Sequence, residues 1–213
     1  MHAARSRSRN LLLWLVLLTI SGCATSTPLS KQAREATRSV SISKTVPLSP
    51  DLYYIGQGQA VSGTILGPFG AAIAAAAEQG PKGQLKVAMQ QASIDVRRII
   101  RDRFKTDLTT AGIFPTIVED GADAEIKLEV RMYGFVHAPF STALKPVLGV
   151  RSVLVRKDGT VIWEKYDQVW TSNGDTPTRP LPEYLEDPAR IEDGFTQASK
   201  VVVGTFMKDL RGQ

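Results

Sequence analysis

The stretch from Glu125 to Val136 restricts the fold of this chain more than any other, because apolar and charged residues alternate along it. Ile126, Leu128, Val130 and Met132 fall on one side of an extended chain, and charged residues fall on the other. Such a strand buries one face and leaves the other in water, which is typical of an antiparallel sheet covered on a single side. The pattern therefore predicts a sheet with helices on one face only.

A hairpin is predicted after this strand. Two apolar runs, 147–156 and 160–171, flank Lys157-Asp158-Gly159, and Asp-Gly between apolar runs is a strong hairpin signal. Two further strands are predicted at 40–48, ending at Pro47, and at 113–118. The returning strand carries three aromatic residues, which we interpret as core or sheet-surface residues rather than a ligand cage: Trp163, Tyr166 and Trp170.

Two amphipathic helices are predicted, one on each side of these strands in the sequence. The first runs from Gln84 to Ala111, before the C-cap residue Gly112, and the second opens at Asp187-Pro188 after a Pro-rich loop at 172–182. The apolar stripe of the first consists of Leu85, Met89, Ala92, Val96, Ile99, Ile100, Phe104 and Leu108. The stripe of the second consists of Ile191, Phe195, Ala198, Val202, Phe206 and Leu210. The fold class is therefore α+β: a two-layer sandwich of a mainly antiparallel sheet of four to five strands, with two amphipathic helices on one face.

The outer side of the first helix carries a charge cluster that consists of Arg97, Arg98, Arg101, Asp102 and Lys105. Helical spacing allows Asp102 to pair with Arg98 and with Lys105. We interpret this cluster as a solvated helix face, and an anion or lipid-headgroup site is the alternative.

A Gly/Ala-rich insertion at about 56–83 separates the first strand from the first helix. It contains the run AAIAAAA at 71–77 and a Gly-x-x-x-Gly spacing at Gly63 and Gly67. The apolar part is too short to span a membrane, and no complete phosphate-binding or dinucleotide-binding motif is present. We expect a flexible or locally helical surface insertion; the alternative is a segment that lies in a membrane or docks on a partner.

The first 22 residues have the three parts of a secretory signal peptide. Three arginines form a basic start, residues 11–18 (LLLWLVLL) form an apolar core, and Ser21-Gly22 are small. The apolar run from Leu11 to Ile20 is ten residues long, whereas a membrane-spanning helix needs about 20. We therefore expect residues 1–22 to be a signal peptide.

Ile20-Ser21-Gly22-Cys23 resembles the lipobox of bacterial lipoproteins, and Cys23 is the only cysteine. The resemblance implies cleavage before Cys23, a diacylglyceryl thioether on its sulfur and an acyl group on its new amine. Each buried methylene contributes about 0.8 kcal/mol, so three acyl chains are expected to anchor the protein stably. Ala24 stands where inner-membrane enterobacterial lipoproteins have Asp, which favours an outer-membrane anchor facing the periplasm. An uncleaved anchor and an ordinary cleaved signal are the alternatives.

The composition and motifs argue against several functions. The leader holds three of the 26 basic residues and none of the 21 acidic ones, so the mature chain has a net charge near +2 and no indication of nucleic-acid binding. The mature chain has one histidine, His137, which makes no triad with Ser141, while Glu125 and Glu129 interleave with cations as surface charges. We expect no catalytic, cofactor-binding or metal-binding residues; a carboxylate-based periplasmic hydrolase is the least favoured hypothesis.

The expected organisation is a lipidated tether at 23–38 and a single domain at 39–213. The element order, the hairpin at 155–163 (VRKDGTVIW) and the final helix resemble small envelope lipoproteins. These include the auxiliary lipoproteins of ABC-type lipid transport, the curli secretion lipoprotein and the amino-terminal domain of TolB. The resemblance implies a non-enzymatic accessory or binding component of an envelope transport or assembly system, with an envelope protein as partner. The alternative is an oligomeric pore or secretion lipoprotein that inserts the Gly/Ala-rich segment into the membrane; the sequence leaves the oligomeric state open.

Overall fold

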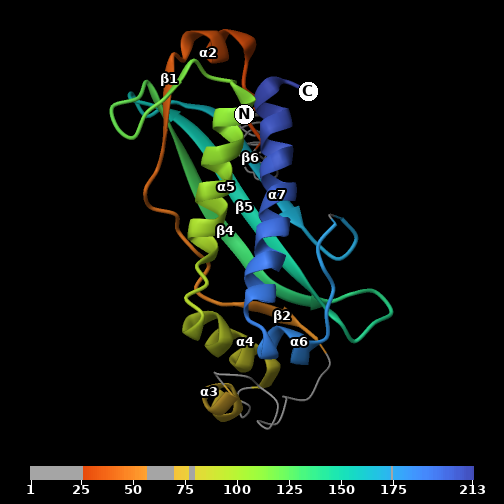
Figure 1. Cartoon of the computed structure of the whole chain (residues 1–213). Coiled ribbons are helices and arrows are strands. Elements are labelled where there is room, and N and C mark those ends of the chain that lie inside the picture. The colour runs from red at the N-terminus through yellow and green to blue at the C-terminus, as the bar shows by residue number, and fades with distance from the viewer. Residues whose placement is uncertain (1–25, 57–69, 77–79, 174) are drawn as a thin grey trace, which may run out of the picture.

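Figure 1 shows the computed structural model of the chain, which describes residues 26–56, 70–76, 80–173 and 175–213. Two long helices, α5 (Val96–Ala111) and α7 (Ala189–Arg211), lie side by side over one face of a twisted sheet. The core fills the space between these two layers, with Phe104 of α5, Phe206 of α7 and Trp163 of the sheet all fully buried. This confirms the predicted two-layer α+β arrangement.

The sheet is mixed and has six strands within the described ranges, whereas the sequence predicted four to five. Its order is β3 (Thr116–Ile117), β1 (Ser39–Ile42), β4 (Ala124–His137), β5 (Leu144–Arg156) and β6 (Val161–Val169), and β2 (Tyr53–Ile55) pairs with the far end of β4. The long pairs β4–β5 and β5–β6 are antiparallel, so most paired residues are antiparallel as predicted. The short strands β1, β2 and β3 pair in parallel.

The additional strand is β2, because two separate segments of the chain, β1 and β2, pair with the same edge of β4. The strand predicted at 40–48 ends as β1 at Ile42, but pairing resumes farther on, where Val130 N donates to Pro47 O (2.8 Å) and Ser49 N donates to Val130 O (2.8 Å). The prediction that Pro47 ends the pairing is therefore wrong. Proline lacks an N–H but keeps its carbonyl, and here only the carbonyl is used.

The predicted hairpin is confirmed. Gly159 has a positive φ of 85°, Gly159 N donates to Arg156 O and Arg156 N donates to Thr160 O, both at 2.9 Å. A glycine in this left-handed conformation closes the three-residue loop without a Cβ clash.

A β-bulge in β4 changes which residues face the helices. The register shifts between Val130 and Met132, so Arg131 is an extra residue opposite β5. Even-numbered residues are buried before the bulge, and the odd-numbered Tyr133 and Phe135 pack on α7 after it. The predicted burial of Met132 is therefore wrong, because one extra residue moves every following side chain to the other face.

The first predicted helix is two helices, α4 (Gly80–Gln91) and α5. The break centres on Ser93, whose φ is 54°, and Asp95 then caps α5 by accepting from Arg97 N at 3.0 Å. Ser and Asp compete with helical hydrogen bonds through their own side chains, which explains a break here. Most of the predicted stripe is nevertheless buried: Leu85, Met89, Val96, Ile100, Phe104 and Leu108.

The last helix matches its prediction, since every residue of its predicted stripe has no exposed surface. Gly212, in the left-handed conformation at φ 80°, ends it. The loop predicted at 172–182 instead leads into a short helix, α6 (Leu181–Glu186), that begins at a Pro-x-Pro sequence and buries Tyr184. Proline is tolerated in a first helical turn, so this loop prediction was too broad.

The expected tether is folded onto the domain from Thr27 onward. Thr27 and Glu164 exchange both backbone hydrogen bonds at 2.9 Å, which adds the chain to the free edge of β6. The helix α2 (Lys31–Ala36) follows, and Arg34 Nη1 donates to Arg211 O at 2.6 Å. Residues 27–38 therefore belong to the folded domain.

Part of the Gly/Ala-rich insertion also packs on the domain. The helix α3 (Gly70–Ala75) contacts α4, Ile73 is fully buried, and Gln84 Nε2 donates to Ile73 O at 3.3 Å. The local helix that the sequence predicted is present at 70–75. The Gly-x-x-x-Gly spacing at Gly63 and Gly67 lies outside the described residues. No helix in the described ranges combines the length and the hydropathy needed to cross a membrane.

Candidate functional site

Cys23, the predicted lipidation site, lies outside the described residues, so its modification stays a prediction. The first described residues after Cys23 nevertheless show where the chain joins the domain. Thr27 is fixed on the edge of β6, four residues after Cys23.

His137 and Ser141 do not come together as a catalytic pair. His137 is the last residue of β4, and its Nε2 approaches Gly56, where an added Cβ would lie 2.9 Å from it. Ser141 lies in the β4–β5 loop, and its Oγ accepts from Ala143 N at 3.0 Å. The hydroxyl therefore stabilises its own loop.

The charged face of β4 forms a cross-strand network. Glu129 contacts Arg131 (3.3 Å) and Arg151 (3.5 Å), and Arg151 Nε donates to Glu164 at 2.6 Å. The hydrogen bond to Glu164 is the largest cause of the raised pKa of Arg151. Glu125 pairs with Lys127 at 3.8 Å. This confirms that Glu125 and Glu129 are sheet-surface charges held by cations.

The three aromatic residues of β6 and its end do not form a cage. Trp163 is buried against Phe206, with ring centroids 5.9 Å apart. Tyr166 is partly exposed, and Trp170 instead contacts Tyr53 at 5.5 Å. Their interpretation as core and sheet-surface residues is confirmed.

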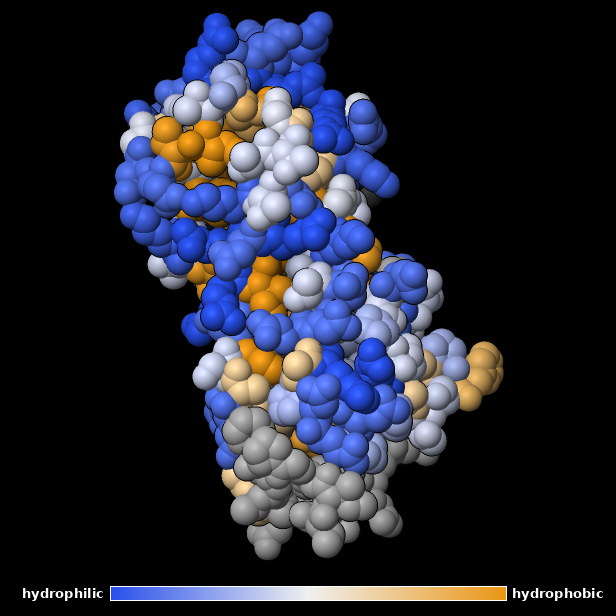
Figure 2. All heavy atoms as spheres, in the orientation of Figure 1, coloured by the Kyte–Doolittle hydropathy of each residue, from blue (hydrophilic) through white to orange (hydrophobic). Residues whose placement is uncertain are grey.

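A hydrophobic loop tip was missed by the sequence analysis. Phe140 in the β4–β5 loop is fully exposed and has a φ of 58°. Figure 2 shows an isolated hydrophobic group where this loop projects from the molecule. An aromatic residue is uncommon at positive φ, and no sequence pattern at 138–143 distinguishes it from an ordinary turn.

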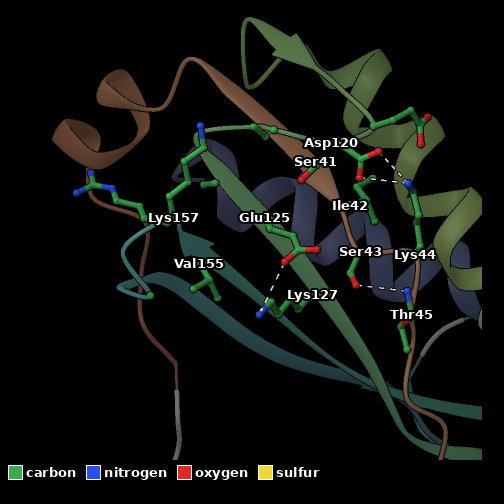
Figure 3. Close-up of a pocket in the computed structure, with 16 residues that line it drawn as sticks. Ser41, Ile42, Ser43, Lys44, Thr45, Asp120, Glu125, Lys127, Val155 and Lys157 are labelled. Carbon is green, nitrogen blue, oxygen red and sulfur yellow. Dashed lines mark hydrogen bonds and ion pairs between the residues drawn. The ribbon is translucent and has the colours of Figure 1, made fainter.

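Two connected hollows lie along the edge of the domain formed by β1 and α5. The first, shown in Figure 3, has a volume of about 580 Å³ and lies between residues 41–45, the 119–122 loop and the β5–β6 hairpin. Lys44 Nζ reaches Asp120 there, at 2.8 and 3.1 Å. This hydrogen bond and the charge of Asp120 raise the pKa of Lys44.

The second hollow, here named the basic cleft, has a volume of about 330 Å³. It is lined by Lys44, Thr45, Val46, Asp95, Arg97, Arg98 and Arg101. Lys44 and Thr45 line both hollows, so the two form one groove. The groove thus joins the chain after β1 to the first turns of α5.

The basic cleft contains three of the cations that the sequence placed on a helix face. Asp102, predicted to pair with Arg98 and Lys105, is not their partner: Arg98 contacts Glu192 at 3.4 Å, and Lys105 pairs with Glu119. The hydrogen bond from Lys105 is the largest cause of the lowered pKa of Glu119. The position of Lys44 in the cleft was not predicted from the sequence. A lysine within an otherwise apolar alternation was the signal that could have indicated it.

No metal-binding cluster of three or more His, Cys, Asp or Glu occurs among the described residues. The basic cleft is lined by charged side chains from two chain segments, the chain after β1 and the start of α5.

Comparisons with known proteins give weak matches only. No family model and no curated protein matches the sequence. A solved Xanthomonas campestris protein of the family described as DUF330 has 16% identity and a TM-score of 0.40, over 55% of this chain and 63% of that one. The match therefore spans less than two thirds of that protein.

Two further solved structures are similar at the same level. The PelC dodecamer from Paraburkholderia phytofirmans has 13% identity and a TM-score of 0.40, over 88% of this chain and 98% of that one. A candidate lipoprotein from Caulobacter crescentus has 16% identity and a TM-score of 0.39, over 55% and 81%. One of these three similar structures is thus described as a lipoprotein, and none of the scores assigns a function to this chain.

Proposed function

We propose that this protein is a lipid-anchored, periplasm-facing lipoprotein of the bacterial outer membrane that acts by binding, as an accessory component of an envelope transport or assembly system. Cys23 carries the lipid, and the α+β domain presents its surfaces to an envelope protein partner. The domain has no catalytic role.

The docking of Thr27 on β6 is the observation that carries this proposal. Four residues span at most about 14 Å, so a lipid on Cys23 holds the β6 edge close to the bilayer. The paired backbone of Thr27 and Glu164 prevents the segment from acting as a long free linker. The opposite edge of the sheet, with the basic cleft, then faces away from the membrane and toward a partner.

The described part of the site supports binding over catalysis. The Ser141 hydroxyl accepts a hydrogen bond within its own loop, and Glu129 is held by two arginines. The burial of Ile73 against the domain also favours an accessory role over insertion of residues 70–76 into a membrane.

The orientation can be tested with fluorophores on the full lipidated protein in liposomes. Because the Cys23 thiol is alkylated, a new cysteine is the only reactive thiol. Asp167→Cys on β6 and Thr45→Cys in the groove place a label near each edge. We expect a headgroup-attached quencher to reduce the emission of the label at 167 much more than that of the label at 45.

A Gly/Ser insertion of 20 residues between Ser26 and Thr27 is the matched control. It lengthens the connection without changing the domain, and we expect it to lower the quenching of the label at 167. Equal quenching of the two labels in the unmodified chain would contradict the proposed orientation.

A further inference from the structure

We propose that the basic cleft binds a phosphate-type anion, with Arg101 as the central ligand. The proposal goes beyond the anchoring and accessory role, because it assigns a ligand class to a particular set of side chains.

The first support is the composition of the cleft. Lys44 enters it from the chain after β1, while Arg97, Arg98 and Arg101 enter it from α5. Asp95 is the single acidic residue in the lining. The lining residues carry four positive charges and one negative charge, and Asp120, from the neighbouring hollow, pairs with Lys44, so the net charge stays positive. The volume of the cleft is at the lower end of the roughly 300–1,000 Å³ typical of ligand pockets.

The second support is how unequally the cations are paired. Arg97 is held by Asp95 through two hydrogen bonds, at 2.8 and 3.1 Å, and Lys44 by Asp120. Arg98 has one long contact of 3.4 Å to Glu192. Among the described residues, Arg101 makes no ion pair, and its buried Nε has no hydrogen-bond partner.

Arg101 therefore has the donor capacity that a bound anion needs. Arg101 lines the cleft, and its guanidinium makes no ion pair with a described residue. A guanidinium presents its donors in a planar fork that matches two phosphate oxygens. Carboxylates match the same fork, but the clustering of several cations around one point favours an anion of higher charge.

The third support is the repulsion within the cluster. Arg97 and Arg98 precede Arg101 by four and three residues, the spacings at which like charges on a helix repel each other. The charge of Arg101 also opposes the protonation of Lys44. An anion between α5 and Lys44 would relieve both effects.

The anion has two sources with the same chemistry, a lipid headgroup or a soluble phosphate compound. The cleft lies on the side of β1, and Thr27 lies on the outer edge of β6. β6 is three strand spacings away from β1. With about 4.8 Å per spacing, the two are separated by more than about 14 Å across the sheet. Anchoring through Cys23 therefore does not by itself bring the cleft into contact with the membrane that holds the lipid.

Isothermal titration calorimetry tests the proposal on the full lipidated protein in nonionic detergent at constant ionic strength. Inorganic phosphate and glycerol 3-phosphate represent the soluble source. Dihexanoyl phosphatidylglycerol represents the headgroup source, with dihexanoyl phosphatidylcholine as its zwitterionic control. The class of compound that binds more tightly, soluble phosphates or phosphatidylglycerol, identifies the source and supports the proposal. If neither class binds, the proposal is overturned.

Two variants distinguish binding in the cleft from attraction by the net positive charge of the protein. We expect Arg101→Gln to weaken binding about tenfold or more, because a hydrogen-bonded charge is lost. Arg131→Gln removes the same charge from the other side of the sheet, next to Glu129, and we expect it to change affinity by less than about twofold. Equal weakening by the two variants would show that the net charge, not the cleft, holds the anion.

Folding provides the second readout. Arg101→Gln removes a buried donor that has no acceptor, so we expect its melting temperature in phosphate-free buffer to equal or exceed that of the wild type. Phosphate should then raise the melting temperature of the wild type and of Arg131→Gln, but not that of Arg101→Gln. A wild-type protein without this shift would overturn the proposal. If Arg101→Gln fails to fold, Lys44→Gln replaces it, and unchanged affinity in that variant would also contradict the site.

Discussion

Trp163 Nε1 donates a hydrogen bond of 2.7 Å to Asp209 Oδ2, which connects the first residues of β6 to the last turns of α7. Trp163 is fully buried, so this is the acceptor for an indole N–H that water cannot reach. Lys165 also donates to Asp209, at 2.9 Å. One carboxylate thus joins the two layers of the domain near its C-terminus.

We expect Asp209→Ala to lower the free energy of unfolding by about 1–3 kcal/mol, because it leaves the buried N–H of Trp163 without an acceptor. Urea denaturation measures the loss. Asp193→Ala, on an exposed position of the same helix, is the control and should cost less than about 0.5 kcal/mol. Equal losses in the two variants would show that the Trp163 hydrogen bond does not contribute.

The pH dependence of stability gives a separate prediction for Asp209. Burial raises its pKa, but the hydrogen bonds from Trp163 and Lys165 and the charge of Lys165 outweigh burial, so the pKa in the folded state is below its ordinary value. The ionised form therefore stabilises the fold above the unfolded-state pKa, about 3.9. This contribution is lost as pH falls through the folded-state pKa.

Asp209→Asn removes this contribution, so its stability should differ from wild type most at neutral pH and converge with it in acid. Urea midpoints measured between pH 7 and pH 3 check the convergence. A difference that stays constant across this range would contradict the assigned pKa shift.

Phe104 is the test of core packing between α5 and α7. It is fully buried, and its ring centroid lies 6.1 Å from that of Phe206. We expect Phe104→Ala to cost about 3–5 kcal/mol, since it removes a large side chain and leaves a cavity. The exposed Thr106→Ala is the control, with an expected cost below about 0.5 kcal/mol. Similar shifts in melting temperature would mean that the buried face of α5 is assigned incorrectly.

Substitution by alanine is expected to have opposite effects on stability at Gly134 and at Gly204. A Cβ at Gly134 would collide with the carbonyl of Tyr53, whereas a Cβ at Gly204, in the interior of α7, would meet nothing within 4 Å. Gly134→Ala should therefore weaken the pairing of β2 with β4 and lower the melting temperature. Gly204→Ala should stabilise the helix by up to about 1 kcal/mol. Calorimetry of both variants checks the signs, and a stabilising Gly134→Ala would refute the close approach.

The sequence predicted the elements whose local pattern and tertiary environment agree. The stripe of α7 from Ile191 to Leu210 is buried as expected, and Asp158-Gly159 closes the expected hairpin. In both cases the residues that determine the element lie within it. The periodicity of a long helix and the left-handed conformation of one glycine are readable without knowing what packs against them.

The errors occur where a single residue breaks a continuing pattern. The alternation of β4 runs through Arg131 without interruption, so the bulge that turns Tyr133 inward leaves no sequence signal. The apolar spacing also continues through Ser93, where the helix divides. The backbone geometry at each point depends on neighbouring strands and helices, and a one-dimensional pattern does not contain it.

The basic cleft could be predicted only in part. The arginines of α5 were evident from their spacing, but Lys44 comes from a segment more than 50 residues earlier. Its approach to Arg101 depends on how β1 lies against α5, which is a tertiary relationship. The docking of Thr27 on β6 was missed for the same reason, since a short polar segment before a domain has the composition of a linker.

Metabolic labelling with radioactive palmitate tests the central claim, lipid anchoring at Cys23, most directly. Cells producing the wild-type chain or Cys23→Ser are labelled, and the protein is isolated from outer-membrane and inner-membrane fractions. We predict label in the wild type, in the outer-membrane fraction and with the mobility of the processed chain, and no label in Cys23→Ser, which should keep its leader. Palmitate label in the Cys23→Ser protein, or an unlabelled wild-type protein, would contradict the lipoprotein assignment.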